Sequence, residues 1–156
     1  MMRICGLKIN MMPTCGSYAD NADMRIENKN RLIYEDLTYK INGILYNVHN
    51  ELGRFRNEKE YGDRIEYYLK QSGLNFEREK TLPPSFEGEQ NGRNRIDFLI
   101  ENKVILEIKT KRFLTREDYY QPKRYLEALG KKLAILVNFR QKYLKPKRIL
   151  NPKVTE

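Results

Sequence analysis

The stretch RNRIDFLIENKVILEIKT, residues 93–110, decides how this chain folds. It holds two runs rich in β-branched and aromatic residues, 93–100 and 104–110, around the polar tripeptide Glu101-Asn102-Lys103. Apolar runs bounded by turn residues are typical of strands. We therefore expect a hairpin with a tight turn at 101–103.

The apolar positions of these two strands predict their register. Successive side chains point to opposite faces, so a slip of one residue would turn an apolar face to the wrong side. A three-residue loop matches the two apolar faces and also opposes the charged residues. The predicted pairs are Ile100 with Val104, Phe98 with Leu106, Ile96 with Ile108, Asp97 with Glu107, and Arg95 with Lys109.

This register brings two carboxylates, those of Asp97 and Glu107, to about 5 Å from each other, with Lys109 one step along the same face. Opposed like charges repel, so a shared proton, a salt bridge to Arg95 or Lys109, or a bound cation must offset the repulsion. Mg²⁺ is a hard cation that binds oxygen ligands of this kind. Such an ion can stabilise charge on a phosphoryl oxygen and lower the pKa of a water molecule. The lysine could position or deprotonate that water, or stabilise transition-state charge.

A salt-bridged, half-exposed strand is the alternative interpretation of the same residues. Alternating charge is common on solvated sheet faces. The run 104–108 is apolar enough to be a central strand, however, where an exposed charged face is unexpected. This favours a functional carboxylate pair.

The rest of the chain surrounds the hairpin with helices and further strands. We expect helices over 37–52 and 57–72, a strand over 76–82, a helix ending at Leu129, a buried strand over 132–139 and a short strand over 147–150. Pro122 lies inside the third helix, which therefore either starts near Asp118 or is kinked. The order α-α-β-β-β-α-β-β predicts a mixed α/β fold with one sheet flanked by helices.

Length and composition limit the remaining possibilities. The 156 residues suit a single domain, which we place at 31–156 behind a poorly ordered extension at 1–30. Cys5 and Cys15 are too far from His49 to form a zinc site. One third of the residues are charged and no long apolar run occurs, which excludes a transmembrane helix. The first ten residues lack the apolar core of a secretory signal, so we expect a cytoplasmic protein.

The formal net charge of +9 indicates a possible polyanionic partner. Basic residues are concentrated over 140–156, which holds six Lys or Arg against Glu156. This segment is either a phosphate-contacting surface or a solvated basic end.

The charged hairpin resembles a known signature. Asp97, nine intervening residues and Glu107-Ile108-Lys109 resemble the motif of the PD-(D/E)XK nuclease superfamily, and the wider sequence resembles the small prokaryotic GxxExxY family within it. Matching segments occur in the same order over 32–150. They are 48–53, 58–61, 96–99, 107–109, Gln121 with Tyr125-Leu126, and 137–139.

The resemblance implies a restriction-endonuclease-like core and an Mg²⁺ (or Mn²⁺) ion. It implies metal ligation by Asp97, Glu107 and Glu58, catalytic roles for Lys109, Asp97, Glu107 and Gln121, and supporting roles for Tyr61 and Tyr125. Three positions depart from the family pattern. Phe55 replaces the naming glycine, Ile96 replaces the proline before the aspartate, and Pro122 could change where Gln121 points.

The leading hypothesis is a metal-dependent nuclease that hydrolyses phosphodiester bonds of nucleic acid, with DNA favoured over RNA. A homodimer is one expectation, because small nucleases of this kind often need a second chain to cut both strands. Two alternatives stay open: a catalytically inactive nucleic-acid-binding domain of the same fold, and a structural or partner-interaction protein.

Overall fold

A computed structural model describes residues 32–155 of the chain, and those from Leu37 onward form one compact unit. The predicted extension at 1–30 lies outside the described residues. No helix of the described part is long and apolar enough to cross a membrane.

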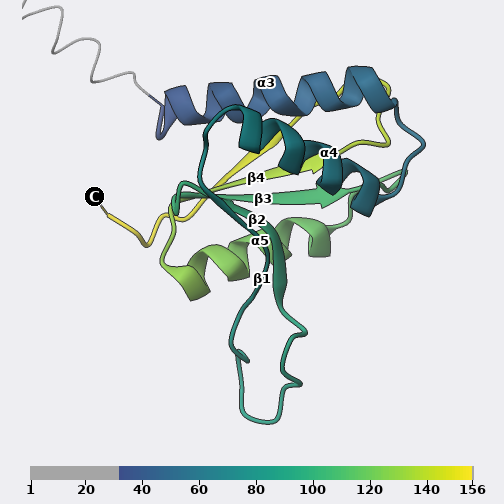
Figure 1. Cartoon of the computed structure of the whole chain (residues 1–156). Coiled ribbons are helices and arrows are strands. Elements are labelled where there is room, and N and C mark those ends of the chain that lie inside the picture. Colours follow the sequence, from purple (N-terminus) through teal and green to yellow (C-terminus); the bar gives the residue numbers. More distant parts are fainter. Residues whose placement is uncertain (1–31, 156) are drawn as a thin grey trace, which may run out of the picture. The chain divides into compact units, whose positions relative to one another are not determined.

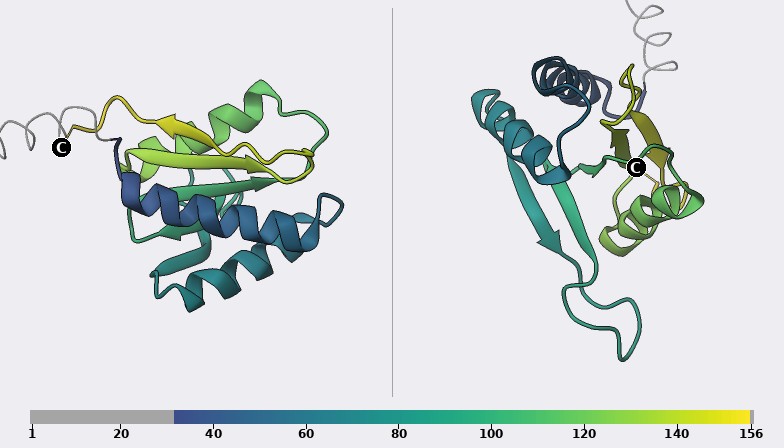
Figure 2. Two further views of the ribbon diagram at one scale, coloured as in Figure 1. Left: turned by 90° about the horizontal axis from the view of Figure 1, so that it is seen from above. Right: turned by 90° about the vertical axis from the view of Figure 1, so that its right-hand side faces the viewer.

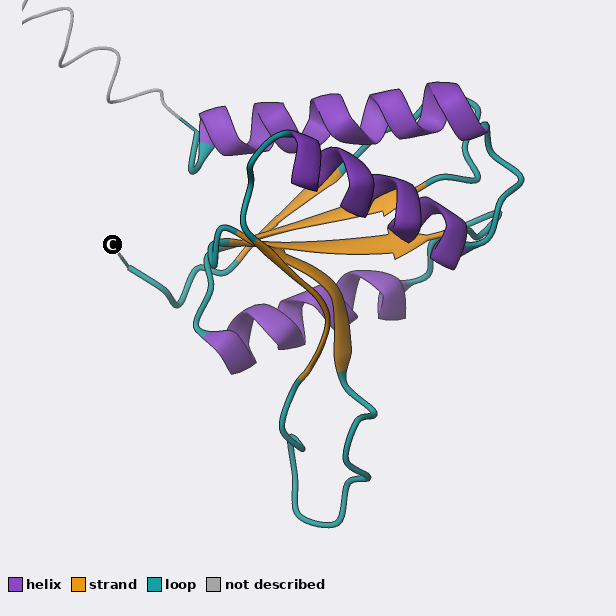
Figure 3. Cartoon of the chain, in the orientation of Figure 1, coloured by secondary structure: helices purple, strands orange, loops and turns teal. Residues whose placement is uncertain are grey.

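The helices and strands follow the predicted order (Figure 1 and Figure 3). They are α3 (Glu35–Leu52), α4 (Glu58–Gln71), β1 (Phe76–Thr81), β2 (Arg95–Ile100), β3 (Val104–Lys109), α5 (Arg116–Leu129), β4 (Leu133–Asn138) and β5 (Lys147–Leu150). The predicted α-α-β-β-β-α-β-β order is therefore confirmed.

Local signals in the sequence set where the helices begin and end. Asn57 starts α4 through a capping box: its Oδ1 accepts from the Glu60 amide at 2.9 Å, and Glu60 Oε2 accepts from the Asn57 amide at 3.0 Å. Helix α5 starts at Arg116 and continues through Pro122, so the alternative of a start near Asp118 is wrong. Gly130 ends it with a left-handed φ of 60°, which glycine adopts without strain.

The five strands form one mixed sheet in the order β1-β2-β3-β4-β5. Strands β1, β2 and β3 are antiparallel neighbours, β3 and β4 are parallel, and β5 is antiparallel to β4. A parallel pair needs a crossover connection, which α5 supplies. All six residues of β4 are buried, as predicted for a strand covered on both faces.

Helices cover both faces of this sheet. Figure 1 and Figure 2 show α3 and α4 on one face and α5 on the other. The core on the α5 side joins the helix to all five strands or their ends. Its buried members are Leu82, Ile96, Leu99, Ile105, Tyr125, Leu126, Ala134, Leu136 and Ile149. This double covering makes β3, the strand with the charged residues, an interior strand.

Truncating Leu136 tests the double burial of β4. Leu136 is fully buried, so we expect Leu136→Ala to lower the free energy of unfolding by about 2–5 kcal/mol. Leu150 in β5 is 49% exposed, and Leu150→Ala is the matched control, with an expected loss below about 1 kcal/mol. Urea unfolding monitored by circular dichroism measures both, and equal losses would contradict the layer arrangement.

Candidate active site

The site begins where β2 and β3 separate. The predicted register is confirmed for Phe98 with Leu106 and for Ile100 with Val104. Pairing ends there, so three predicted pairs are not formed: Ile96 with Ile108, Asp97 with Glu107, and Arg95 with Lys109. Beyond Phe98, β2 stays with β1 instead, pairing Ile96 with Lys80 and Arg95 with Thr81.

Asp97 occupies the opening between the two strands. Its Oδ2 accepts a hydrogen bond from the Ile108 amide at 2.6 Å, in the place where a strand carbonyl would otherwise accept. Burial raises the pKa of Asp97 above its ordinary value, although the Ile108 amide and the charge of Lys109 act in the opposite direction. The carboxylate is therefore partly desolvated but anchored to the neighbouring strand.

Glu107 is the most deeply buried acid of the site, with 2% of its surface exposed. Its Oε1 lies 3.3 Å from Lys109 Nζ, whereas Oε2 is buried without a hydrogen-bond partner. Burial and the nearby charge of Asp97 raise the pKa of Glu107 to about 8, and Lys109 only partly offsets them. The predicted repulsion between the two carboxylates is thus present although their backbones are not paired.

Lys109 is held by side chains from two elements. Its Nζ donates to Gln121 Oε1 at 2.9 Å and to Glu107 Oε1 at 3.3 Å. Gln121 Nε2 in turn donates to the Tyr125 hydroxyl at 2.8 Å. Pro122 therefore does not turn Gln121 away from the site, and the chain of hydrogen bonds from α5 to β3 orients the amine.

The electrostatic environment keeps this amine protonated. Burial alone would lower the pKa of Lys109, but the charges of Glu107, Glu58 and Asp97 outweigh it and raise the pKa above the ordinary lysine value. Lys109 is therefore a charged donor near neutral pH.

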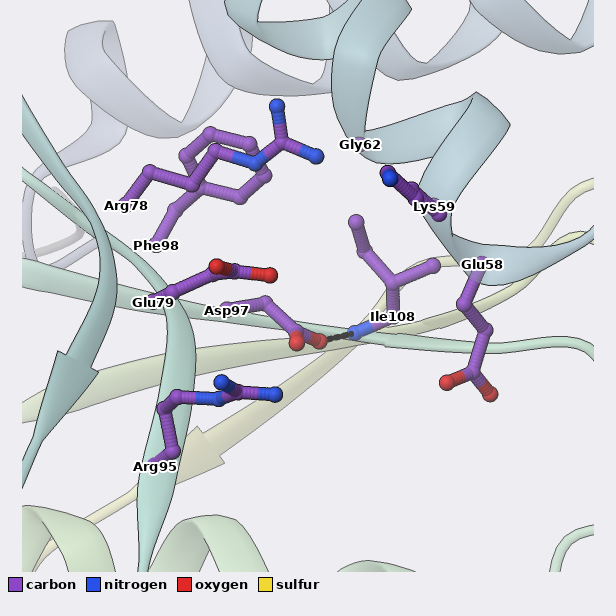
Figure 4. Close-up of a pocket in the computed structure, with 9 residues that line it drawn as sticks. All are labelled: Glu58, Lys59, Gly62, Arg78, Glu79, Arg95, Asp97, Phe98 and Ile108. Carbon is purple, nitrogen blue, oxygen red and sulfur yellow. Dashed lines mark hydrogen bonds between the residues drawn. The ribbon is translucent and has the colours of Figure 1, made fainter. Parts of the chain in front are cut away.

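A pocket of about 300 Å³ lies beside Asp97 on the α4 side of the sheet (Figure 4). Residues from α4, β1, β2 and β3 line it: Glu58, Lys59, Gly62, Arg78, Glu79, Arg95, Asp97, Phe98 and Ile108. Figure 4 shows the carboxylates of Asp97 and Glu58 on either side of Ile108. Glu58, a residue of the first turn of α4, thus shares the pocket with Asp97 and is exposed to solvent.

Contacts with β1 hold α4, and with it Glu58, over this pocket. Arg78 forms ion pairs with Asp63 at 2.7 Å and with Glu66 at 2.5 Å. A Cβ at Gly62 would lie 2.8 Å from Arg78 Nη2, so glycine leaves room for the Arg78 guanidinium against the helix. Tyr61 anchors the helix start, because its hydroxyl donates to Gly53 O at 2.5 Å.

The pattern of the sequence did not reveal Glu79 as a pocket residue. Glu79 has a left-handed φ of 53° although it lies within a strand, a conformation that is rare for residues other than glycine. Its neighbours pair with Phe98 and Ile96, which leaves Glu79 across from Asp97 without a pairing of its own. Its carboxylate points into the pocket in Figure 4. A glutamate in an alternating strand carries no local sign of such a backbone.

The residues present fit a hard cation. Glu107 has an unpartnered Oε2 and feels the charge of a second partly buried carboxylate, that of Asp97, and oxygen donors of this type suit Mg²⁺ or Mn²⁺. Between residues 32 and 155 no three acidic, histidine or cysteine side chains form a group placed to hold a metal ion. Two pairs of these carboxylates are brought near each other: the charge of Asp97 acts on Glu107, and Asp97 shares its pocket with Glu58.

The raised pKa of Glu107 predicts a pH-dependent loss of stability. In metal-free buffer the unfolded chain releases this proton near pH 4.5 but the folded chain only near 8, so stability falls as the pH rises across this interval. The slope approaches about 1.4 kcal/mol per pH unit. Glu107→Gln removes the titrating group and with it this slope. The free energy of unfolding of the variant should therefore rise relative to that of the wild type as the pH increases.

Urea unfolding of wild type and variant at the two ends of this interval measures the effect. Subtracting one free energy of unfolding from the other at each pH cancels the contribution of the other titrating groups. A constant difference between wild type and variant would contradict a neutral Glu107. Glu117→Gln, an exposed change on α5, is the matched control.

Comparison with known proteins agrees with this geometry. A model of the PD-(D/E)XK nuclease superfamily matches residues 35–149. Neither the curated proteins nor the solved structures provide a match. The five-stranded mixed sheet with its three flanking helices is consistent with the predicted restriction-endonuclease-like core. The chain belongs to the PD-(D/E)XK nuclease superfamily.

Proposed function

We propose that this protein is a nuclease that hydrolyses phosphodiester bonds of nucleic acid with Mg²⁺ or Mn²⁺. One observation carries the proposal: Glu107 is buried with an unpartnered Oε2, while its Oε1 contacts Lys109 and its ionisation is opposed by the charge of Asp97. A buried, incompletely bonded carboxylate destabilises a fold, so its presence favours a functional role over a structural one. Membership of the superfamily, whose nucleases generally use divalent metals, supports the same reaction.

Asp97 and Glu107 are the proposed metal ligands, and Glu58 is the proposed third ligand from α4. A bound divalent ion supplies stabilisation of phosphoryl charge and a water molecule of lowered pKa. The Ile108 amide keeps Asp97 fixed at 2.6 Å, so this ligand is oriented before any ion binds. Glu58 is exposed to solvent and lines the same pocket as Asp97, so it would bind the ion from the α4 side.

Lys109 is the proposed catalytic lysine, and its raised pKa favours one of the roles open to it. A protonated amine cannot accept a proton from water, but it can donate a hydrogen bond to an oxygen on which negative charge develops. Gln121 is the proposed positioning residue, because it bonds Lys109 directly and is itself held by Tyr125.

Several finer features belong to the proposal. Membership of the GxxExxY family rests on the ordered motif matches, and DNA is the favoured substrate. A homodimer is required only if both strands of a duplex are cut. Cytoplasmic location agrees with the composition of the chain.

Loss of the Asp97 or the Lys109 charge should strongly reduce cleavage. We expect Asp97→Asn and Lys109→Ala to reduce Mg²⁺-dependent cleavage of labelled DNA by roughly 100- to 10,000-fold. Lys153→Ala, at an exposed lysine that pairs with Glu127, is the matched control and should retain full activity. Equal activity of all variants would mean that another site or a contaminant cuts the DNA. Binding without cleavage by the wild type would favour the inactive nucleic-acid-binding alternative.

Metal affinity separates two of the proposed ligands, Asp97 and Glu58. Mn²⁺ binding, followed as a rise in the unfolding midpoint, should weaken by more than roughly 100-fold in Asp97→Asn. It should weaken by about tenfold in Glu58→Gln, because Glu58 is exposed to solvent whereas Asp97 is partly buried. Unchanged affinity in Glu58→Gln would remove this residue from the ligand set.

A further inference from the structure

Three exposed aromatic side chains lie in three separate loops. Phe55 is in the loop between α3 and α4, Phe113 in the loop between β3 and α5, and Tyr143 in the loop between β4 and β5. Their exposed fractions are 72%, 73% and 70%. Figure 1 and Figure 2 show the three loops at one end of the unit, where β3 and β4 end. We call these three residues the aromatic rim.

Hydrogen bonds and a ring stack hold the first and third of these loops together. His49, near the end of α3, donates from Nε2 to the carbonyl oxygen of Gln141 at 2.9 Å. The Tyr61 ring stacks on Phe139, with 4.1 Å between centroids and 13° between planes. Because Tyr61 also bonds Gly53, the loop that carries Phe55 is fixed to the end of β4.

The loop that carries Phe113 is fixed to the same strand end. Asn138 is buried, and its Nδ2 donates to Lys111 O at 2.7 Å while its Oδ1 accepts from the Lys111 amide at 3.1 Å. Hydrogen bonds and ring packing therefore fix all three loops to the rest of the fold. The exposure of the three rings follows from these fixed loop positions.

Each rim aromatic has a cationic neighbour. Arg54 and Arg140 lie over Phe55, at 4.9 and 5.6 Å from its centroid. Arg112 lies 5.3 Å from Phe113, and Lys142 lies 5.4 Å from Tyr143.

These four cations differ from others nearby. Arg56 and Lys111 are paired with Glu60 and Asp118, whereas the four form no ion pair with residues 32–155. The rim therefore combines exposed aromatic rings with four positive charges that no acidic residue between 32 and 155 pairs with.

The rim also adjoins the candidate active site. Lys109 ends β3, and Phe113 lies in the segment that follows it. Phe55 lies just before Asn57 and Glu58, which start α4. Two of the three rim loops are therefore directly continuous with elements that carry proposed catalytic or metal-binding residues.

We propose that the aromatic rim binds single-stranded nucleic acid, with unpaired bases stacked on Phe55, Phe113 and Tyr143 and phosphates beside their cationic neighbours. The proposal rests on the proposed function, because it names the substrate class of that site. Exposed rings with interleaved cations suit a single strand, whose bases are free to stack. A duplex keeps its bases stacked inside and presents phosphates, which cations alone would bind.

Fluorescence anisotropy in EDTA tests the rim without cleavage. The probes are a labelled mixed-sequence DNA strand of about 20 nucleotides, longer than the site of a typical single-strand binder, its blunt duplex, and the RNA strand of the same sequence. We expect Phe113→Ala and Tyr143→Ala each to raise the Kd for the single strand by about 5- to 150-fold. The Kd for the duplex should change less than about twofold, because phosphate contacts remain.

Two matched variants separate ring stacking from other effects. Tyr143→Phe keeps the ring and should keep the affinity. Tyr39→Ala removes a tyrosine that is 81% exposed near the start of α3, the end of the helix away from the rim, and should also keep it. Unfolding midpoints of all variants should match the wild type, because the rings are exposed. Comparing the DNA strand with the RNA strand shows which sugar the rim prefers. Tight binding of either strand supports the proposal.

The outcomes for the rim and for the enzyme are distinguishable. Unchanged single-strand affinity in both alanine variants, or equal affinity for strand and duplex, would overturn the rim proposal even if the protein cuts DNA. Rim-dependent binding of a single strand together with absent cleavage would retain the rim and overturn the proposed nuclease.

Discussion

The burial of Glu107 in an interior strand is the constraint on which the rest of the site depends. Placing a carboxylate in a low-dielectric interior is unfavourable unless hydrogen bonds or opposite charge compensate for the lost water. Lys109 supplies part of that compensation from two positions along the same strand, at 3.3 Å. The second oxygen has no partner, and the charge of Asp97 adds to the cost of ionisation. The fold therefore holds a site that is electrostatically incomplete by itself.

The separation of β2 from β3 gives that site access. Had the ladder continued past Phe98 and Leu106, backbone hydrogen bonds would have closed the space beside Asp97. The Asp97 carboxylate instead satisfies the Ile108 amide, so the strands part without leaving a buried donor unpaired. The pocket between α4 and the sheet opens at this point. The hydrogen bond from the Ile108 amide to Asp97 is therefore what allows the site to be accessible.

Helices on opposite faces bring the remaining polar groups. From one face, α5 contributes Gln121 and Tyr125, which orient the lysine amine. From the other, α4 contributes Glu58, and the ion pairs of Arg78 hold that helix in place. The loops that follow β3 and β4 carry exposed rings with cationic neighbours. Stable elements thus position the groups proposed for chemistry, and the loops between them carry the groups proposed to contact the substrate.

The sequence by itself determined the order of elements, the loop at 101–103 and the register of Phe98 to Ile100 against Val104 to Leu106, because alternation and turn chemistry are local properties of the chain. It also identified Asp97, Glu107, Lys109 and Gln121, which the structure brings close to one another. Only the tertiary structure decided where the ladder stops, that Glu79 adopts a left-handed backbone, and that Glu58 shares a pocket with Asp97. Those features depend on the pairing of β1 with β2 and on the packing of α4 against the sheet. Contacts between segments far apart in the chain leave no periodic trace in the residues themselves.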